Sequence, residues 1–289
     1  ISGLMFFLLF GTVGHYTQGF AFRFDENNDF IEAKMKLSPN YGLNEKCTKD
    51  FLLGDNCATS FNPEILVWGD SYAMHLIPGI LSSKEDVKLR QATVSQCAPI
   101  LDYAVSVAIH GALNCIRFND RVYNWLSKSE VKYVVLSSPF ARLYDDRSVV
   151  DRNGKLYSNG ADITRKGIIN LIHKIRDMGK VPVIVTPPPV NGSDLGACLL
   201  RSKLKNKSMS SCNFLRMEIL EQKQFVTNEI DQMLNVQVIN LTDLICNEIS
   251  CKAVINGKFL FRDTGHLSIE GSRALGEKHD FYRLIVSAE

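Results

Sequence analysis

The chain has 289 residues, of which 45% are hydrophobic and 22% charged, and its formal net charge at pH 7 is +2. This length suffices for one substantial core plus an appendage. The nearly neutral charge argues against a nucleic-acid-binding protein, because the basic residues are scattered apart from Lys203, Lys205 and Lys207.

The chain begins with an apolar, uncharged stretch at 1–14, and its first charged residue is Arg23. The stretch lacks the basic start and the cleavage site of a signal peptide. It is also shorter than the roughly 20 apolar residues that cross a bilayer. A buried amphipathic helix is the alternative, but no polar face is present. Residues 1–20 are therefore predicted to be the outgoing end of a transmembrane helix, and 21–62 a linking segment that packs on the following domain.

From residue 63 onward, strand-like runs alternate with helical patterns. Strands are predicted at 64–69, 87–94, 131–137, 181–186 and 236–241, and helices at 72–83, 115–128, 163–178, 213–234 and 269–285. Alternation of this kind predicts an α/β fold with a parallel sheet covered on both faces. Short β-branched runs suit strands that are buried on both sides. Residues 63–289 are therefore predicted to form one domain.

The eight cysteines fall into four close couples, which are Cys47 with Cys57, Cys97 with Cys115, Cys198 with Cys212, and Cys246 with Cys251. Eight cysteines allow 105 connectivities. Sequential pairing is the simplest, because each couple would close a short loop beside a predicted strand or helix. Eight free thiols in a cytosolic enzyme are the alternative. Disulfides would place the chain in an oxidising compartment such as a periplasm or the extracellular space.

The apolar run at 65–71 ends abruptly on Gly69, Asp70 and Ser71. In parallel α/β folds, ligands gather at the carboxyl ends of the strands, so Ser71 is a candidate nucleophile. A plain turn is the alternative. Asp70 is predicted to cap the following helix or to bond neighbouring backbone N–H groups. His75 lies one helical turn beyond Ser71 and is interpreted as a structural histidine, with contact to the site as the alternative.

A serine nucleophile needs a base, and the base needs a carboxylate that orients it. Asp263 and His266 stand three residues apart before the last predicted helix, a spacing that puts both on one face of a turn. Each motif alone is weak, and Asp263 could simply cap a helix. Together they predict a triad of Ser71, His266 and Asp263 suited to acyl transfer. The tetrahedral intermediate of acyl transfer carries an oxyanion that needs hydrogen-bond donors. We expect these donors to be the Ser71 backbone N–H and a group from the loop at Ser95 and Gln96.

Aromatic and basic residues near the same sheet edge are candidates for binding a sugar, with core packing as the alternative. They are Trp68, Tyr72, Phe140, Arg142 and Tyr144. No Gly-x-Gly-x-x-Gly motif and no pair of histidines with metal-ligand spacing is present, so neither a nucleotide cofactor nor a metal is predicted.

The segment 68–76 (Trp-Gly-Asp-Ser-Tyr-Ala-Met-His-Leu) resembles the first motif block of SGNH (GDSL-type) hydrolases, and 263–268 (Asp-Thr-Gly-His-Leu-Ser) resembles their last block. With the turn at 95–99 (Ser-Gln-Cys-Ala-Pro), the chain resembles the SGNH domains fused to bacterial acyltransferase-3 membrane proteins. The resemblance covers about residues 60–285. It implies a three-layer α/β/α, flavodoxin-like fold and the triad named above.

This chain departs from the family pattern at two points. Tyr72 stands where the fused family usually has a histidine. The glycine and asparagine that complete the oxyanion hole of free SGNH esterases have no clear counterpart, and Ser95 or Gln96, and Ser138, occupy the approximate positions.

The resemblance also implies a function, because its relatives include O-antigen O-acetyltransferases. We therefore expect an acetyl group to pass from Ser71 to a hydroxyl of a surface polysaccharide such as lipopolysaccharide O-antigen. The expected partners are an N-terminal acyltransferase-3 domain supplied by acetyl-CoA, and the inner membrane, with the SGNH domain on its periplasmic face. The alternatives are a secreted carbohydrate esterase and a non-catalytic module that presents polysaccharide.

Overall fold

The computed structural model describes residues 2–17, 29–50, 55–106, 111–139, 148–219 and 235–287. Its centre is a five-stranded sheet in the order β2-β1-β4-β7-β9. The strands are β1 (Ile65–Gly69), β2 (Leu89–Thr93), β4 (Tyr133–Ser137), β7 (Val181–Val185) and β9 (Gln237–Ile239). All four neighbouring pairs are parallel. This confirms the predicted α/β fold with a parallel sheet.

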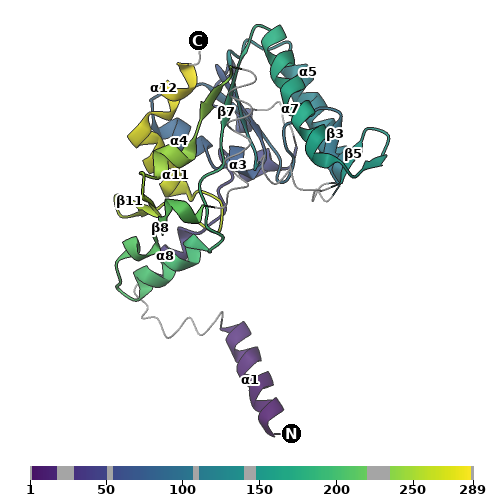
Figure 1. Cartoon of the computed structure of the whole chain (residues 1–289). Helices are drawn as coiled ribbons and strands as arrows, with labels where there is room; N and C mark the ends of the chain where they lie inside the picture. The colour runs from purple at the N-terminus through teal and green to yellow at the C-terminus, as the bar shows by residue number, and fades with distance from the viewer. Residues whose placement is uncertain are drawn as a thin grey trace.

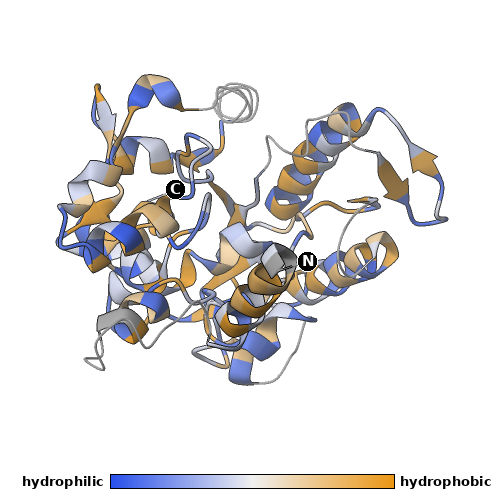
Figure 2. Ribbon diagram, turned by 90° about the horizontal axis from the view of Figure 1, so that it is seen from below, coloured by the Kyte–Doolittle hydropathy of each residue, from blue (hydrophilic) through white to orange (hydrophobic). Residues whose placement is uncertain are grey.

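Helices cover both faces of this sheet (Figure 1). On one face lie α5 (Ala112–Leu126) and α7 (Gly160–Asp177), and on the other α4 (Ile77–Ser82), α11 (Ile269–His279) and α12 (Phe281–Val286). Successive residues of β1 point to opposite faces, so Ile65 and Val67 join one buried core while Leu66 and Trp68 join the other. Figure 2 shows hydrophobic residues in the central strands and mixed hydrophobic and hydrophilic stretches on the surrounding helices.

Further elements complete the described structure. The helical ones are α1 (Ser2–Tyr16), α2 (Asp29–Met35), η2 (Glu45–Thr48), η3 (Asp55–Cys57), α3 (Ser71–Met74), α8 (Leu195–Leu204), η4 (Met209–Cys212), η5 (Arg216–Glu218) and α10 (Leu241–Ile245). The strands are β3 (Tyr103–Val105), β5 (Val149–Asp151), β6 (Leu156–Tyr157), β8 (Phe214–Leu215), β10 (Ser250–Cys251), β11 (Val254–Ile255) and β12 (Lys258–Phe259). They form small antiparallel sheets outside the central one.

Three predicted helices need correction. The helix predicted at 213–234 is wrong at its start, because Phe214 pairs with Cys251 in a two-stranded sheet; residues 220–234 lie outside the described residues. The helix predicted at 269–285 divides at Asp280, whose backbone is left-handed with φ 52° and whose carboxylate caps α12. The helix predicted at 72–83 likewise divides into α3 and α4.

The apolar start of the chain forms α1, and its large side chains are exposed from Met5 to Phe10. Among the helices of the described ranges, none combines the length and apolar character needed to cross a membrane. The transmembrane assignment of 1–20 therefore stays a prediction. Within the segment at 21–62, Leu43 donates its backbone N–H to the side chain of Gln91, whose amide donates to the Tyr41 carbonyl.

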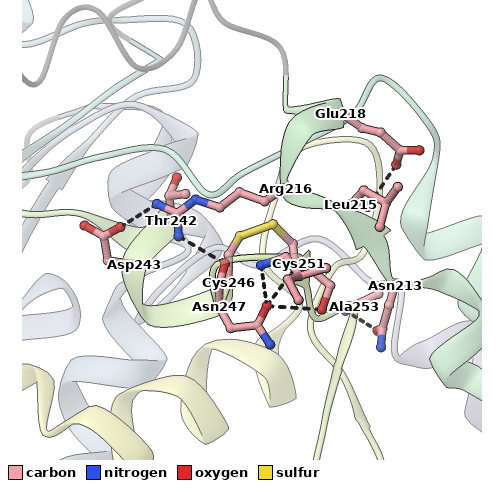
Figure 3. Close-up of a disulfide and its surroundings, with 12 residues drawn as sticks. Asn213, Leu215, Arg216, Glu218, Thr242, Asp243, Cys246, Asn247, Cys251 and Ala253 are labelled. Atoms are coloured by element: carbon pink, nitrogen blue, oxygen red, sulfur yellow. Dashed lines mark hydrogen bonds and ion pairs between the residues drawn. A yellow bond between two sulfur atoms is a disulfide. The ribbon is translucent and has the colours of Figure 1, made fainter.

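The four predicted disulfides are all present in sequential pairing. Figure 3 shows the Cys246–Cys251 bond. Beside it, Asn213 accepts the backbone N–H of Ala253 and Arg216 donates to the Asn247 carbonyl. The pairing confirms the prediction from spacing, and disulfides of this number are typical of extracytoplasmic proteins.

Candidate active site

Ser71 is the first residue of α3 and lies directly beyond the carboxyl end of β1. The Asp70 carboxylate caps this helix, accepting the Tyr72 backbone N–H at 2.9 Å, as predicted. A side chain at Gly69 would collide with the Ser137 carbonyl of the neighbouring strand β4. The glycine therefore lets β1 and β4 approach closely, and the capped helix begins immediately beyond them with Ser71.

The loop before α11 orients an aspartate and a histidine toward each other. Asp263 Oδ1 accepts the backbone N–H groups of Gly265 and His266, both at 2.8 Å. The two carboxylate oxygens lie 3.0 and 2.9 Å from His266 Nδ1. A proton on Nδ1 therefore has a strong acceptor, which leaves Nε2 of the neutral ring as a hydrogen-bond acceptor.

The structure brings these two segments into contact. Ser71 Oγ lies 2.8 Å from His266 Nε2, although the residues are 195 positions apart in the chain. This is the nucleophile–base–carboxylate geometry of serine acyl transfer, in which the base takes the hydroxyl proton as the serine attacks. The residues predicted to act together therefore form one continuous hydrogen-bonded chain.

The electrostatics of Asp263 suit this role. Burial acts to raise the pKa of its carboxyl, but the hydrogen bond from His266 and the two backbone N–H groups hold the pKa well below its ordinary value. Arg262 adds a cation whose Nη2 lies 3.6 Å from Asp263 Oδ2. Asp263 is thus a carboxylate at neutral pH and can stabilise an imidazolium on His266.

Ser138, predicted near the oxyanion site, has a different partner. Its hydroxyl is buried and donates to Asp70 Oδ2 at 2.7 Å. The structure therefore shows Ser138 supporting the capping carboxylate and does not place it as an oxyanion donor. Burial raises the pKa of Asp70 to about 6, against the opposing effect of this bond and the Tyr72 N–H.

The second predicted oxyanion element lies at the same sheet edge. β2 ends at Thr93, which is in register with Gly69. The turn after it contains the half-buried Ser95 and the exposed Gln96, whose φ is 60°. Their role as donors, with the Ser71 backbone N–H, stays a prediction.

Two of the predicted sugar-binding residues are buried. Trp68 has no exposed surface, and its indole N–H donates to Asn119 Oδ1 at 2.8 Å in the core. Tyr72 is 3% exposed and packs on the His266 ring, with centroids 4.8 Å apart. Neither side chain offers a face to a sugar, because packing within the domain covers both.

The other sugar-binding candidates, Phe140, Arg142 and Tyr144, lie outside the described residues. In the part of the chain that the structure describes, no group of three or more His, Cys, Asp or Glu side chains is arranged to hold a metal ion.

Sequence reasoning missed two supports of the site. The Asp70–Ser138 bond links the residue before Ser71 to the end of β4. Gly265 faces Tyr72, because a Cβ at this position would lie 2.7 Å from the tyrosine hydroxyl. The local pattern contains no signal for either, since both depend on which strands and loops become neighbours.

The parallel sheet, the serine at the end of β1 and the Asp-x-x-His loop before α11 define an SGNH-type domain of the acyltransferase and hydrolase class. More specifically, the chain belongs to the family described as "SGNH domain (fused to AT3 domains)", whose model matches residues 44–280. No curated protein sequence matches it.

The solved structures that are similar to this one include two bacterial proteins. The first is the periplasmic domain of a lipopolysaccharide acetyltransferase from Salmonella ser. Paratyphi A, with 18% sequence identity and a TM-score of 0.62 over 89% of this chain and 97% of that chain. It supports the fold. The second is a candidate acylhydrolase from Bacteroides fragilis, with 9% identity and a TM-score of 0.41 over 79% of this chain and 91% of that chain. That score is too low to support an inference.

Proposed function

We propose that this chain is the extracytoplasmic domain of an O-acyltransferase that carries an acetyl group on Ser71 and passes it to a hydroxyl of a bacterial surface polysaccharide, such as lipopolysaccharide O-antigen. The 2.8 Å contact between Ser71 Oγ and His266 Nε2 carries this proposal. The family supports transfer, because its SGNH domains are fused to AT3 domains.

The reaction has two steps with the same three side chains. In the first, Ser71 Oγ attacks the acyl carbonyl while His266 Nε2 takes the hydroxyl proton, which then passes to the leaving group. In the second, a sugar hydroxyl attacks the acyl-serine, and His266 takes its proton and returns it to Ser71. Asp263 stabilises the imidazolium in both steps. The Ser71 backbone N–H and the turn at Ser95 and Gln96 are the proposed oxyanion donors.

The proposed acyl donor is an AT3 membrane domain that draws acetyl groups from cytoplasmic acetyl-CoA. The proposed location is the periplasmic face of the inner membrane, with residues 1–20 as the end of a transmembrane helix and 21–62 as the linking segment. The four disulfides support an oxidising compartment, and the exposed apolar side chains of α1 support contact with a bilayer.

The central experiment replaces Ser71 with alanine in the full-length protein in cells. Acetylation of the purified polysaccharide, measured by NMR, should be abolished, while circular dichroism shows an unchanged fold. Ser193→Ala, at an exposed position, is the matched control and should acetylate normally. An unaltered acetyl content in the Ser71→Ala strain would refute the proposal.

A second measurement separates transfer from hydrolysis, since the same three residues serve both. The purified chain is incubated with acetylated polysaccharide and free acetate is measured. Rapid release without a membrane partner would favour a carbohydrate esterase. Full activity in cells of Ser71, Asp263 and His266 single variants would favour a non-catalytic presenting module.

A further inference from the structure

A second histidine, His75, lies within the candidate active site and takes no part in the proposed proton transfers. It ends α3 and is 1% exposed. Its ring centroid lies 5.4 Å from that of Tyr72 and 6.0 Å from that of His266. Its presence beside the base requires an explanation, because a buried imidazole is costly unless its nitrogens are used.

His75 is bonded to both halves of the site. Its backbone N–H donates to the Ser71 carbonyl at 3.2 Å. Its ring Nδ1 accepts the backbone N–H of Leu267 at 3.2 Å, across 192 positions of the chain. Leu267 follows His266, so this N–H belongs to the peptide group directly after the base.

This bond completes the support of the base. The His266 N–H donates to Asp263, and the His266 carbonyl accepts the Arg262 N–H at 3.0 Å. With the Leu267 N–H held by His75, the N–H and the carbonyl of His266 and the N–H of the next residue all have partners. Three hydrogen bonds therefore hold the backbone at His266 while Asp263 orients its ring, and the acceptor of one of them is a residue at the end of the helix that carries the nucleophile.

We propose that His75 is a positioning residue that, as a neutral imidazole, ties the loop of His266 to the helix of Ser71 and so holds the base against the nucleophile. This rests on the function proposed above. An Nδ1 that accepts a hydrogen bond carries no proton, so the ring proton is on Nε2. That Nε2 has no hydrogen-bond partner among the described residues. An apolar side chain at position 75 would avoid the cost of burying this Nε2–H without a partner. The hydrogen bond that Nδ1 accepts therefore explains why a histidine stands here.

The surroundings favour the neutral form. Burial, with the nearby His266 and Arg262, lowers the pKa of His75 well below its ordinary value, and Asp263 acts in the opposite direction. A neutral His75 places no second cation beside His266 when His266 takes up the serine proton.

The test measures how fast Ser71 reacts with a fluorophosphonate ester in the purified 289-residue chain, by intact mass. In this reaction Ser71 Oγ forms the bond to phosphorus, fluoride leaves with the P–F electron pair, and the serine proton passes to His266. His75→Phe removes the acceptor and should react about tenfold to a hundredfold more slowly, the range expected when a buried, aligning hydrogen bond is lost. His75→Asn keeps an acceptor near Nδ1 and should stay within about threefold of the natural chain.

Ser272→Ala is the matched control. Ser272 is fully buried, and its hydroxyl accepts the Gly79 backbone N–H at 3.0 Å, joining α4 to α11 across 193 positions. This variant should lose stability and keep the reaction rate. If His75→Phe behaves in the same way, with a lower melting temperature and an unchanged rate, the inference is overturned while the nucleophilic Ser71 stands.

Nuclear magnetic resonance of histidine-labelled protein tests the inference without any reaction. The low-field proton on His266 Nδ1 should be sharp in the natural chain and in Ser272→Ala, and broadened by exchange in His75→Phe. His75 itself should show the Nε2–H tautomer at neutral pH. If Ser71 proves unreactive, the proposed function fails, and a sharp His266 signal in His75→Phe would independently overturn the positioning role.

Discussion

Replacing Asp70 with asparagine is expected to make the folded protein more stable at neutral pH. Asp70 is 4% exposed, and its two oxygens accept from Tyr72 and Ser138. Asparagine can keep both contacts, since its oxygen accepts the Tyr72 N–H and its amide donates to the Ser138 hydroxyl. The substitution therefore removes the buried charge and leaves the cap.

The magnitude follows from the pKa of this carboxyl. Burial raises it from the ordinary 3.8 to about 6 in the folded protein. The folded state binds the proton of the Asp70 carboxyl more tightly than the unfolded chain does. The stabilisation of the folded state by this proton is therefore fully present below about pH 4 and is lost as the pH rises through 6. At neutral pH the buried carboxylate costs the folded state about 3 kcal/mol relative to the unfolded chain.

Urea unfolding of the natural chain and Asp70→Asn, at about pH 4 and about pH 7, measures this effect. The difference in unfolding free energy should change by about 2–3 kcal/mol between the two conditions, in favour of asparagine at the higher pH. Asp194→Asn is the control, because Asp194 caps α8 through the Ala197 N–H with an exposed carboxylate. A difference between Asp70→Asn and the natural chain that is the same at both pH values would refute the reasoning.

Three further predictions concern the site and the domain that carries it. Gly265→Ala should lower the free energy of unfolding in urea by about 1–3 kcal/mol, because the new methyl group meets the Tyr72 hydroxyl. Adding Tyr72→Phe should recover part of the loss. A Gly265→Ala variant as stable as the natural chain would contradict the clash. Replacing Cys198 and Cys212 with serine should cost about 2–4 kcal/mol, and an unchanged urea midpoint would show that this loop needs no covalent closure. Asp263→Asn should slow acetyl transfer about 10⁴-fold in a folded protein, and polysaccharide NMR showing near-normal acetylation would rule out the carboxylate's role.

The local sequence pattern was sufficient to predict most of the central domain. The strands predicted at 64–69, 131–137 and 181–186 match β1, β4 and β7 within a residue or two. They were recognisable because a strand buried on both faces must be apolar at consecutive positions. The disulfide pairing was also predictable, since each couple of cysteines is close along the chain.

The failures arose where distant residues override local preference. Phe214 was predicted in a helix but pairs with Cys251, which the disulfide from Cys246 holds in place. At the break at Asp280 the chain changes direction, and both α11 and α12 contact α4. A helical pattern in the sequence carries no information about such partners.

For the site, the sequence by itself determined which residues are the candidates for the chemistry. Ser71 follows a strand, and Asp263 and His266 are close enough along the chain to orient each other. Only the tertiary structure decided the 2.8 Å contact between serine and histidine and the burial of Asp70 and His75. The reason is physical, because contact and burial depend on the strand order and loop packing that bring atoms nearly two hundred residues apart together.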